Sequence, residues 1–232
     1  MVQRCLAVAA ALAVAGALLT PGKAQASDRI VALFPPWPGV APALVAQDLG
    51  YFAEEGLDFV WRFEAERSVV SAAMARGDID IDMRSIGEYQ SSPRSARTPG
   101  LIIGTVDVSV GGDGVVVDQS ITAATDLKGR TVAFEPNIPA RLLLQLELQK
   151  AGLTLGDVKV KEMGSADSVA VFQDPSVAAI ATYEPYLSQV LNPALRPGAK
   201  LLVSSQDYPG IVLDVVIARN AALVENPEKF RK

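Results

Sequence analysis

Two tyrosines and a glutamate surround a proline at residues 183–186, which read Tyr-Glu-Pro-Tyr. The apolar run 177–182 before them has the composition of a buried strand, so a carboxylate at its end must find a cation, a hydrogen-bond donor or water. Glu184 could therefore accept a ligand ammonium or ring N–H, while Tyr183 and Tyr186 pack a flat or cationic ligand. Alternatively, Glu184 caps the following helix, with the proline at the first helical position. Both roles are compatible.

Other polar and aromatic residues stand just after predicted strands or just before predicted helices. In open α/β sheets ligands bind beyond the carboxyl ends of the strands, and helix N-termini favour anions. These positions are therefore candidates for ligand contact. The further candidates are Trp37, Arg84, Ser85, Asp113, Asn137, Ser165 and Asp214.

Three of these candidates lie in the first hundred residues, and each has an alternative role. Trp37 stands between prolines after the first predicted strand and could line a cleft or pack on its own domain. Arg84 could clamp an anionic group through two hydrogen bonds or form an exposed salt bridge. Ser85 could donate to a ligand or cap the next helix.

The remaining candidates lie in or after the Gly-rich segment 109–114, which lacks the Lys-Ser/Thr of a P-loop and suits close backbone passage at a hinge. Asp113 in this segment could face a cleft. Asn137 and Ser165 could contact a ligand or only cap helices, and the proline after Ile138 removes an N–H that an anion would use. Asp214, inside an apolar strand, is favoured as a hinge carboxylate over a cleft acid.

The composition excludes several functions. The 232 residues contain no histidine and one cysteine, Cys5, which excludes Ser-His-Asp and Cys-His catalysis and zinc sites that need imidazole. A net charge of -5 and the lack of a basic block argue against nucleic-acid binding. An enzyme that uses only carboxylates remains an alternative, but we expect a non-enzymatic protein without a metal or cofactor.

Residues 1–26 have the pattern of a secretory signal. A basic start precedes an apolar core that is too short to span a membrane, and Ala24-Gln25-Ala26 is a small-x-small cleavage site. The alternative is an uncleaved membrane anchor. Cys5 lies inside this segment, so the exported chain would contain no thiol. We expect the mature protein in the periplasm.

The remainder alternates between strand and helix patterns. Predicted strands at 29–34, 57–63 and 79–83 are separated by predicted helices at 39–52 and 68–77, the first closed by Gly50 and the second with Ser68 as its N-cap. Such alternation indicates a largely parallel sheet covered by helices. A second α/β unit spans about 121–203. Two apolar, strand-like runs lie within 101–118 and two more within 200–218, and each pair suits a crossing between the two units.

The last residues begin a helix, with Asn226 as its cap and Pro227 in its first turn. Only a few helical residues follow, and a lone helix that short is marginal unless it is packed. This pattern predicts either a fragment or a shortened family member.

Several segments, in this order, carry a resemblance to a known family. They are GYFAEEGLDF, GGDGVVV, DLKGRTVAFEP, YEPYLSQVL and the run from SSQDYPG to the end. The chain resembles the periplasmic substrate-binding proteins of nitrate, sulfonate, taurine and thiamine-precursor ABC importers, from about residue 29 to 232. The step at 183–186 looks like the aromatic-Glu-Pro-aromatic step of this branch.

The resemblance implies a two-lobed periplasmic-binding-protein (Venus-flytrap) fold, each lobe an α/β, mainly parallel sheet with helices on both faces. We assign 27–112 to lobe 1, 113–212 to lobe 2 and 213–232 to a return crossing into lobe 1. Family members usually continue further, and the segment that completes lobe 1 is expected to be missing here.

The function implied is capture of a small organic ligand, such as a sulfonate, a taurine-like compound or a pyrimidine thiamine precursor. The partners implied are an ABC permease with its ATPase, and we expect a monomer. The excess of acids among the candidates favours a zwitterionic, aromatic or heterocyclic ligand over bare nitrate. Alternatives are a sensing or truncated, non-transporting relative, and a thiamine-pyrimidine-synthase-like enzyme, which depends on His and a Cys-rich motif.

Overall fold

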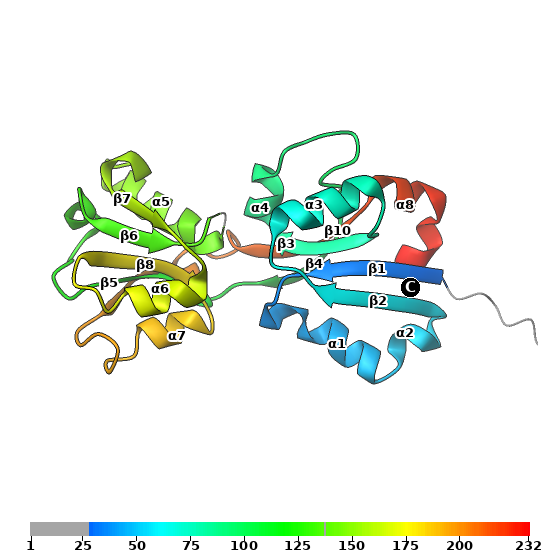
Figure 1. Ribbon diagram of the computed structural model, residues 1–232, viewed down its shortest axis with the longest axis horizontal. Coiled ribbons are helices and arrows are strands. Elements are labelled where there is room, and N and C mark those ends of the chain that lie inside the picture. Colours follow the sequence, from blue (N-terminus) through cyan, green and yellow to red (C-terminus); the bar gives the residue numbers. More distant parts are fainter. Residues whose placement is uncertain (1–27, 137) are drawn as a thin grey trace, which may run out of the picture.

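The computed structural model describes residues 28–136 and 138–232, so the predicted signal at 1–26 and the candidate Asn137 lie outside the described residues. Two five-stranded sheets, each packed against helices, form two lobes that lie side by side (Figure 1). The expected two-lobed α/β fold is confirmed. Within the described residues, no helix is both long enough and apolar enough to cross a membrane.

Lobe 1 contains the sheet with strand order β2-β1-β3-β10-β4. Its strands are β1 (Asp28–Phe34), β2 (Leu57–Phe63), β3 (Ile81–Ser85), β4 (Leu101–Val108) and β10 (Leu213–Ala218). Its helices are η1 (Pro38–Val40), α1 (Ala41–Asp48), α2 (Tyr51–Glu54), α3 (Arg67–Arg76), α4 (Ile86–Ser91), α8 (Asn220–Glu225) and η5 (Pro227–Phe230). Separate apolar clusters on the two faces of the sheet pack against α1 and α2 and against α3 and α4.

The helix expected at 39–52 with Gly50 closing it ends as α1 just before Gly50, which adopts a left-handed backbone conformation with φ of 81°, and a separate short helix, α2, follows. Two other helix predictions in lobe 1 need correction. The N-cap of α3 is Glu66, with extended backbone, and Ser68 already lies inside the helix. At the C-terminus, the Asn226 side chain accepts a hydrogen bond from the Lys229 N–H, but it caps a 3-10 helix that follows α8.

Lobe 2 contains the sheet with strand order β7-β6-β8-β5-β9. Its strands are β5 (Asp113–Val117), β6 (Thr131–Phe134), β7 (Lys159–Glu162), β8 (Val177–Tyr183) and β9 (Lys200–Ser204). Its helices are η2 (Ala124–Leu127), α5 (Pro139–Lys150), η3 (Leu155–Asp157), α6 (Ser165–Val171), α7 (Tyr186–Val190) and η4 (Ser205–Asp207).

Both sheets are mixed, whereas the alternation of strands and helices predicts mainly parallel ones. In each sheet three strands that are linked through helices are parallel: β2, β1 and β3 in lobe 1, and β7, β6 and β8 in lobe 2. The remaining pairs are antiparallel. The reason is topological: β10 and β5 each enter their sheet directly from the other lobe, and so run against their neighbours.

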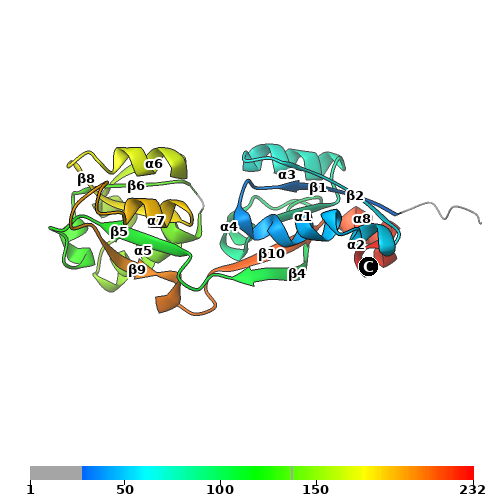
Figure 2. The ribbon, with the colours of Figure 1, turned by 90° about the horizontal axis from the view of Figure 1, so that it is seen from below.

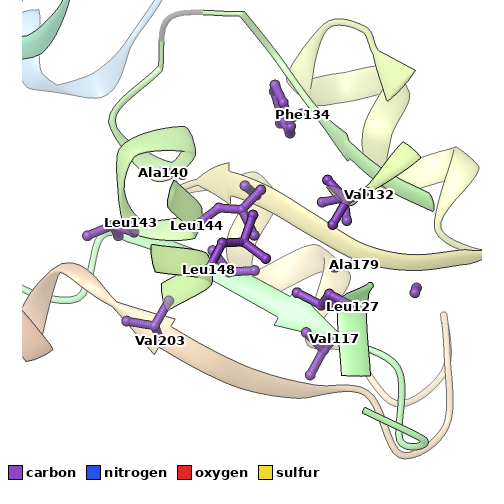
Figure 3. Close-up of a cluster of buried hydrophobic side chains, with 14 of the residues drawn as sticks. Val117, Leu127, Val132, Phe134, Ala140, Leu143, Leu144, Leu148, Ala179 and Val203 are labelled. Atoms are coloured by element: carbon purple, nitrogen blue, oxygen red, sulfur yellow. The ribbon is translucent and has the colours of Figure 1, made fainter. Parts of the chain in front are cut away.

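The core of lobe 2 forms where α5 packs on the sheet. Leu144 and Leu148 of α5 are fully buried beside Val132 of β6 and Val203 of β9 (Figure 3). The apolar residues of α5 recur at helical spacing and face the sheet. A second cluster on the opposite face packs against α6 and α7. Each lobe therefore has its own core and can hold cleft residues rigidly.

Two chain segments cross between the lobes, from β4 to β5 and from β9 to β10 (Figure 2). They are joined to each other: the Ser109 N–H donates to the Val212 carbonyl at 3.0 Å, and the Gly111 N–H donates to the Ser205 hydroxyl at 2.8 Å. Gly111 has φ of 88°, a conformation that favours glycine. The paired segments form the hinge between the lobes.

Candidate functional site: a cleft between the lobes

A cavity of about 600 Å³ lies between the two lobes and is lined by residues of both lobes and of the hinge. Eight of the ten sequence candidates line it. They are Trp37, Arg84, Asp113, Ser165, Tyr183, Glu184, Tyr186 and Asp214. The carboxyl ends of several strands meet at this place, in agreement with the rule for open α/β sheets.

Ser85 does not line the cavity. Its hydroxyl accepts a hydrogen bond from the Glu88 N–H, and the Glu88 carboxylate accepts one from the Ser85 N–H, so the two residues form a capping box at the start of α4. Ser85 is almost fully buried. Of its two possible roles, the structure therefore shows the helix cap.

Arg84 lines the cavity but is held by other residues of lobe 1. Its guanidinium pairs with the buried Asp82, with Nε donating to Oδ2 at 2.5 Å, and Nη1 donates to the Ser92 hydroxyl at 2.9 Å. Arg84 is only 4% exposed, so the exposed salt bridge considered as its alternative role is wrong: the ion pair is buried. Burial raises the pKa of Asp82, against the opposing effect of the arginine charges. The guanidinium is thus largely occupied.

Arg67, at the start of α3, is the more accessible cation of the cavity wall. Its Nε lies 2.9 Å from Glu88 Oε1, and its Nη1 lies 3.8 Å from Asp82 Oδ1. Its side chain is 30% exposed. Sequence reasoning missed Arg67 because it treated this position as the residue before a helix and Ser68 as the cap.

The lobe 2 wall contains a hydrogen-bonded group around Glu135. One carboxylate oxygen of Glu135, Oε2, accepts from both the N–H and the hydroxyl of Ser165, at 3.2 and 2.8 Å. Gly164 is the N-cap of α6, so the expected role of Ser165 as the cap is wrong. Burial, together with the Glu135 charge, raises the pKa of Tyr183 to about 12, which keeps this phenol protonated.

Tyr183 and Tyr186 form an edge-to-face pair, with ring centroids 5.6 Å apart and planes at 84°. Between them in sequence, Glu184 accepts hydrogen bonds from the hydroxyl and the N–H of Ser188, at 2.7 and 3.2 Å. Glu184 therefore satisfies a free N–H of α7 while it also lines the cavity. Pro185 is the N-cap of α7 and does not occupy the first helical position.

Trp37 combines the two roles considered for it. Its indole packs against the lobe 1 core and lines the cavity. A Cβ atom at Gly39 would lie 1.8 Å from the indole ring, so only glycine allows the ring to rest on this turn. The ring is therefore fixed by lobe 1 and presents its free face to the cleft.

Three carboxyl groups meet where the hinge reaches the cavity. Asp107 of β4 and Asp214 of β10 are partners in the antiparallel register, and Asp113 begins β5 with 7% exposure. Burial raises the pKa of Asp214 to about 8, with the negative charges of Asp107 and Asp113 adding to the effect. Burial also raises the pKa of Asp113 to about 6, although a hydrogen bond from Ser109 opposes it.

The described lining is strongly acidic. Its seven carboxylic acids are Glu66, Glu88, Asp107, Asp113, Glu135, Glu184 and Asp214, and its two basic residues are Arg67 and Arg84. Both arginines already contact carboxylates of lobe 1. The arrangement can therefore hold a ligand through hydrogen bonds from the ligand, through attraction of positive charge, and through aromatic contact.

Comparison with known proteins identifies the family. The model of the family described as NMT1/THI5 like matches residues 37–232. The chain belongs to the NMT1/THI5-like family. This result confirms the resemblance that the sequence motifs carry.

The relatives of this NMT1/THI5-like chain include a protein of Brucella abortus named as a binding protein, 26% identical over 196 residues. That alignment covers 84% of this chain and 60% of the relative, so this chain spans less than two thirds of the curated protein it matches. An Escherichia coli protein named as an aliphatic sulfonates-binding protein is 34% identical over 93 residues, which are 40% of this chain and 28% of that protein. Both of these relatives are named as binding proteins.

Among solved structures, the periplasmic aliphatic sulphonate binding protein SsuA from Escherichia coli superposes with a TM-score of 0.72 at 21% identity, covering 88% of this chain and 69% of that chain. The periplasmic nitrate-binding protein NrtA from Synechocystis superposes with a TM-score of 0.64 at 17% identity, covering 88% of this chain and 58% of that chain. These structures confirm the fold.

Several residues of this NMT1/THI5-like cleft were not found from the sequence. They are Glu66, Arg67, Glu88, Asp107, Ser109 and Glu135. Two of them could have been recognised from the sequence by the rule for carboxyl ends of strands. Glu135 directly follows β6, and Asp107 lies at the carboxyl end of β4. Glu66, Arg67 and Glu88 lie at helix starts, and their direction toward the cleft depends on how the helices pack, while Ser109 lies in the hinge segment after β4.

Proposed function

We propose that this NMT1/THI5-like protein captures a small organic solute between its lobes and delivers it to an ABC import permease. The observation that carries the proposal is the cavity of about 600 Å³ whose walls come from both lobes and from the hinge. A solute of a few rings fits such a volume, because ligand pockets of 300–1,000 Å³ are usual for small molecules.

The walls support a ligand that combines a flat ring with a positive or hydrogen-donating group. Tyr183, Tyr186 and Trp37 offer aromatic faces from the two lobes. Glu184 and Glu135 offer carboxylate oxygens in the same cavity. A zwitterionic, aromatic or heterocyclic solute, such as a pyrimidine precursor, matches these groups better than bare nitrate or a simple sulfonate, which would meet an excess of negative charge.

In this proposal the sequence candidates that line the cavity, apart from Arg84, are ligand contacts of different kinds. Arg84 acts mainly through its ion pair with Asp82, which fixes the strand end below the cleft. Export to the periplasm through residues 1–26 and delivery to a permease with its ATPase complete the proposal. The resemblance implies both, and the relatives named as binding proteins support the binding role.

An enzymatic function on the same fold is less well supported. A thiamine-pyrimidine-synthase-like activity depends on histidine and a Cys-rich motif, and this sequence has no histidine and a single cysteine in its first residues. The named relatives are binding proteins. We therefore propose binding without turnover.

Native mass spectrometry of the purified protein, incubated with a small-molecule extract, tests the proposal. We expect one bound small molecule, whose mass identifies it, and its retention should fall on substitution of the cleft residue Tyr186→Ala. Exposed Tyr51→Ala in lobe 1 is the matched control. Capture of no compound, or conversion of the captured compound to a product, would contradict the proposal.

A further inference from the structure

The three hinge carboxyl groups lack a positive partner within the described part of the chain. Asp107 and Asp214 face each other across β4 and β10 and line the same cavity. Asp113 lines the same end of the cavity and is more than nine-tenths buried. The salt bridges of residues 28–136 and 138–232 include none of these three acids.

The groups that surround them do not neutralise them. The titratable and charged neighbours are Asp82 and Arg84 on β3, Glu88 on α4, Arg67 on α3 and Tyr183 on β8. Arg84 is paired with Asp82, and Arg67 contacts Glu88 and Asp82, so both positive charges are directed to other acids. Ser109 is the hydroxyl that faces Asp113. The hinge end of the cavity is therefore a place of uncompensated negative charge.

We propose that Asp107, Asp113 and Asp214 bind the cationic group of an organic ligand, which replaces a proton held between Asp107 and Asp214 in the empty cleft. This inference rests on the proposed function and adds the ligand class and a proton linkage. The proton leaves a carboxyl oxygen for solvent, and the ligand forms no covalent bond. For a ligand with one positive charge, the net charge of the site stays the same.

An organic cation fits this place better than a metal ion. The described residues contain no group of three or more His, Cys, Asp or Glu side chains arranged to hold a metal ion. Tyr183 lies opposite Asp113 in the β5–β8 register, and Tyr186 and Trp37 line the same cavity. Aromatic faces beside carboxylates attract ammonium and other organic cations.

The pKa values of Asp113 and Asp214 agree with the replacement of a proton by a cationic ligand. Burial raises the pKa of Asp214 to about 8, so this carboxyl keeps its proton near neutral pH. Burial raises the pKa of Asp113 to about 6, so Asp113 is mostly ionised at the same pH. A cation that enters stabilises the ionised form of Asp214 and lowers its pKa.

The first test needs no ligand. Carboxyl carbon NMR of the protein labelled at aspartate, with Asp107→Asn and Asp214→Asn for assignment, follows the three groups through a pH titration. We expect one carboxyl of the Asp107–Asp214 pair to titrate above about pH 7, far from the ordinary value near 3.9. Titration of both below about pH 5 would overturn the inference and leave solute capture in the cleft untouched.

The second test uses named probes. Choline and putrescine are the cations, ethanesulfonate and nitrate are the anions, and thermal unfolding is recorded at about pH 5.5 and 8. We expect a cation at ten times its Kd to raise Tm by roughly 3–6 °C, with tighter binding at the higher pH. Asp113→Asn should weaken the effect at least tenfold in Kd, while the exposed Glu162→Gln of β7 should retain it.

Titration calorimetry in two buffers of different ionisation enthalpy completes the test. We expect release of about one proton for each bound cation near pH 7, and a smaller release in Asp214→Asn. Stabilisation by the anions and not by the cations would overturn the inference but would still support capture of a solute. Equal cation affinity at both pH values, without proton release, would also overturn it.

Discussion

Asp107 and Asp214 lie opposite each other on the antiparallel strands β4 and β10, at the point where the hinge meets the cleft. Two like charges at this place cannot both ionise easily, and burial adds to the cost. One of the pair, Asp214, therefore has a pKa raised to about 8. The group with this raised pKa therefore lies at the hinge between the two lobes.

The first prediction concerns stability and pH. Because the pKa of Asp214 is raised in the folded protein, the folded state keeps a proton that the unfolded chain has lost between about pH 4 and 8. The free energy of unfolding should therefore fall as pH rises through this window, by a few kcal/mol. In Asp214→Asn this fall should shrink, and the variant should be more stable than the wild type near pH 8.

Urea unfolding at a series of pH values measures this effect. The exposed Asp48→Asn of α1 serves as the control and should follow the wild-type curve. A wild-type stability that rises from pH 5 to 8 with the same slope in Asp214→Asn would contradict the prediction.

The second prediction separates the two roles of Glu184. The substitution Glu184→Gln keeps one acceptor oxygen for the Ser188 N–H, places an amide N–H₂ that can donate to the Ser188 hydroxyl, and removes the charge that faces the cavity. We expect a change in Tm of only a few degrees, because the amide oxygen still satisfies α7, and a loss of ligand affinity of about tenfold or more. Binding measured by calorimetry with the captured solute decides, and unchanged affinity would leave Glu184 with the capping role alone.

The third prediction tests the buried ion pair of Arg84 and Asp82. Removing the guanidinium in Arg84→Met leaves Asp82 buried at 0% exposure without its closest partner, and should cost about 3–5 kcal/mol of stability. The exposed pair of Arg29 and Asp58, 3.7 Å apart, is the matched control. Arg29→Met should cost less than about 1 kcal/mol. Chemical denaturation measures the free energy of unfolding of both variants. Equal losses would show that the buried ion pair contributes no more to stability than the exposed one.

The fourth prediction concerns the rigidity of lobe 2. Leu144 of α5 is fully buried between the helix and the sheet, so Leu144→Ala should destabilise the protein by about 2–5 kcal/mol. Leu201 on the edge strand β9 is 42% exposed and provides the comparison. Leu201→Ala should cost under about 1 kcal/mol. Similar losses for both, measured by urea unfolding, would place the core elsewhere.

The sequence predicted most of the strands correctly because their apolar runs are short and are separated by clear turn and helix patterns. The strand at 57–63 and the crossing strand at 101–108 agree with β2 and β4. The rule for the carboxyl ends of strands then pointed to residues such as Tyr183 and Glu184, which line the cavity. Local pattern and chain order suffice for these conclusions.

The tertiary structure decided how those residues are used. The sequence does not indicate that Arg84 is paired with Asp82, that Glu135 binds Ser165, or that Asp107 faces Asp214, because these contacts depend on strand register and on helix packing between distant segments. The mixed direction of the sheets has the same origin, since only the path through the hinge shows that β10 and β5 enter from the other lobe. The sequence by itself determined the elements and the chemical character of the cleft, and the fold determined which charges neutralise each other and which face the cavity without an oppositely charged partner in the described residues.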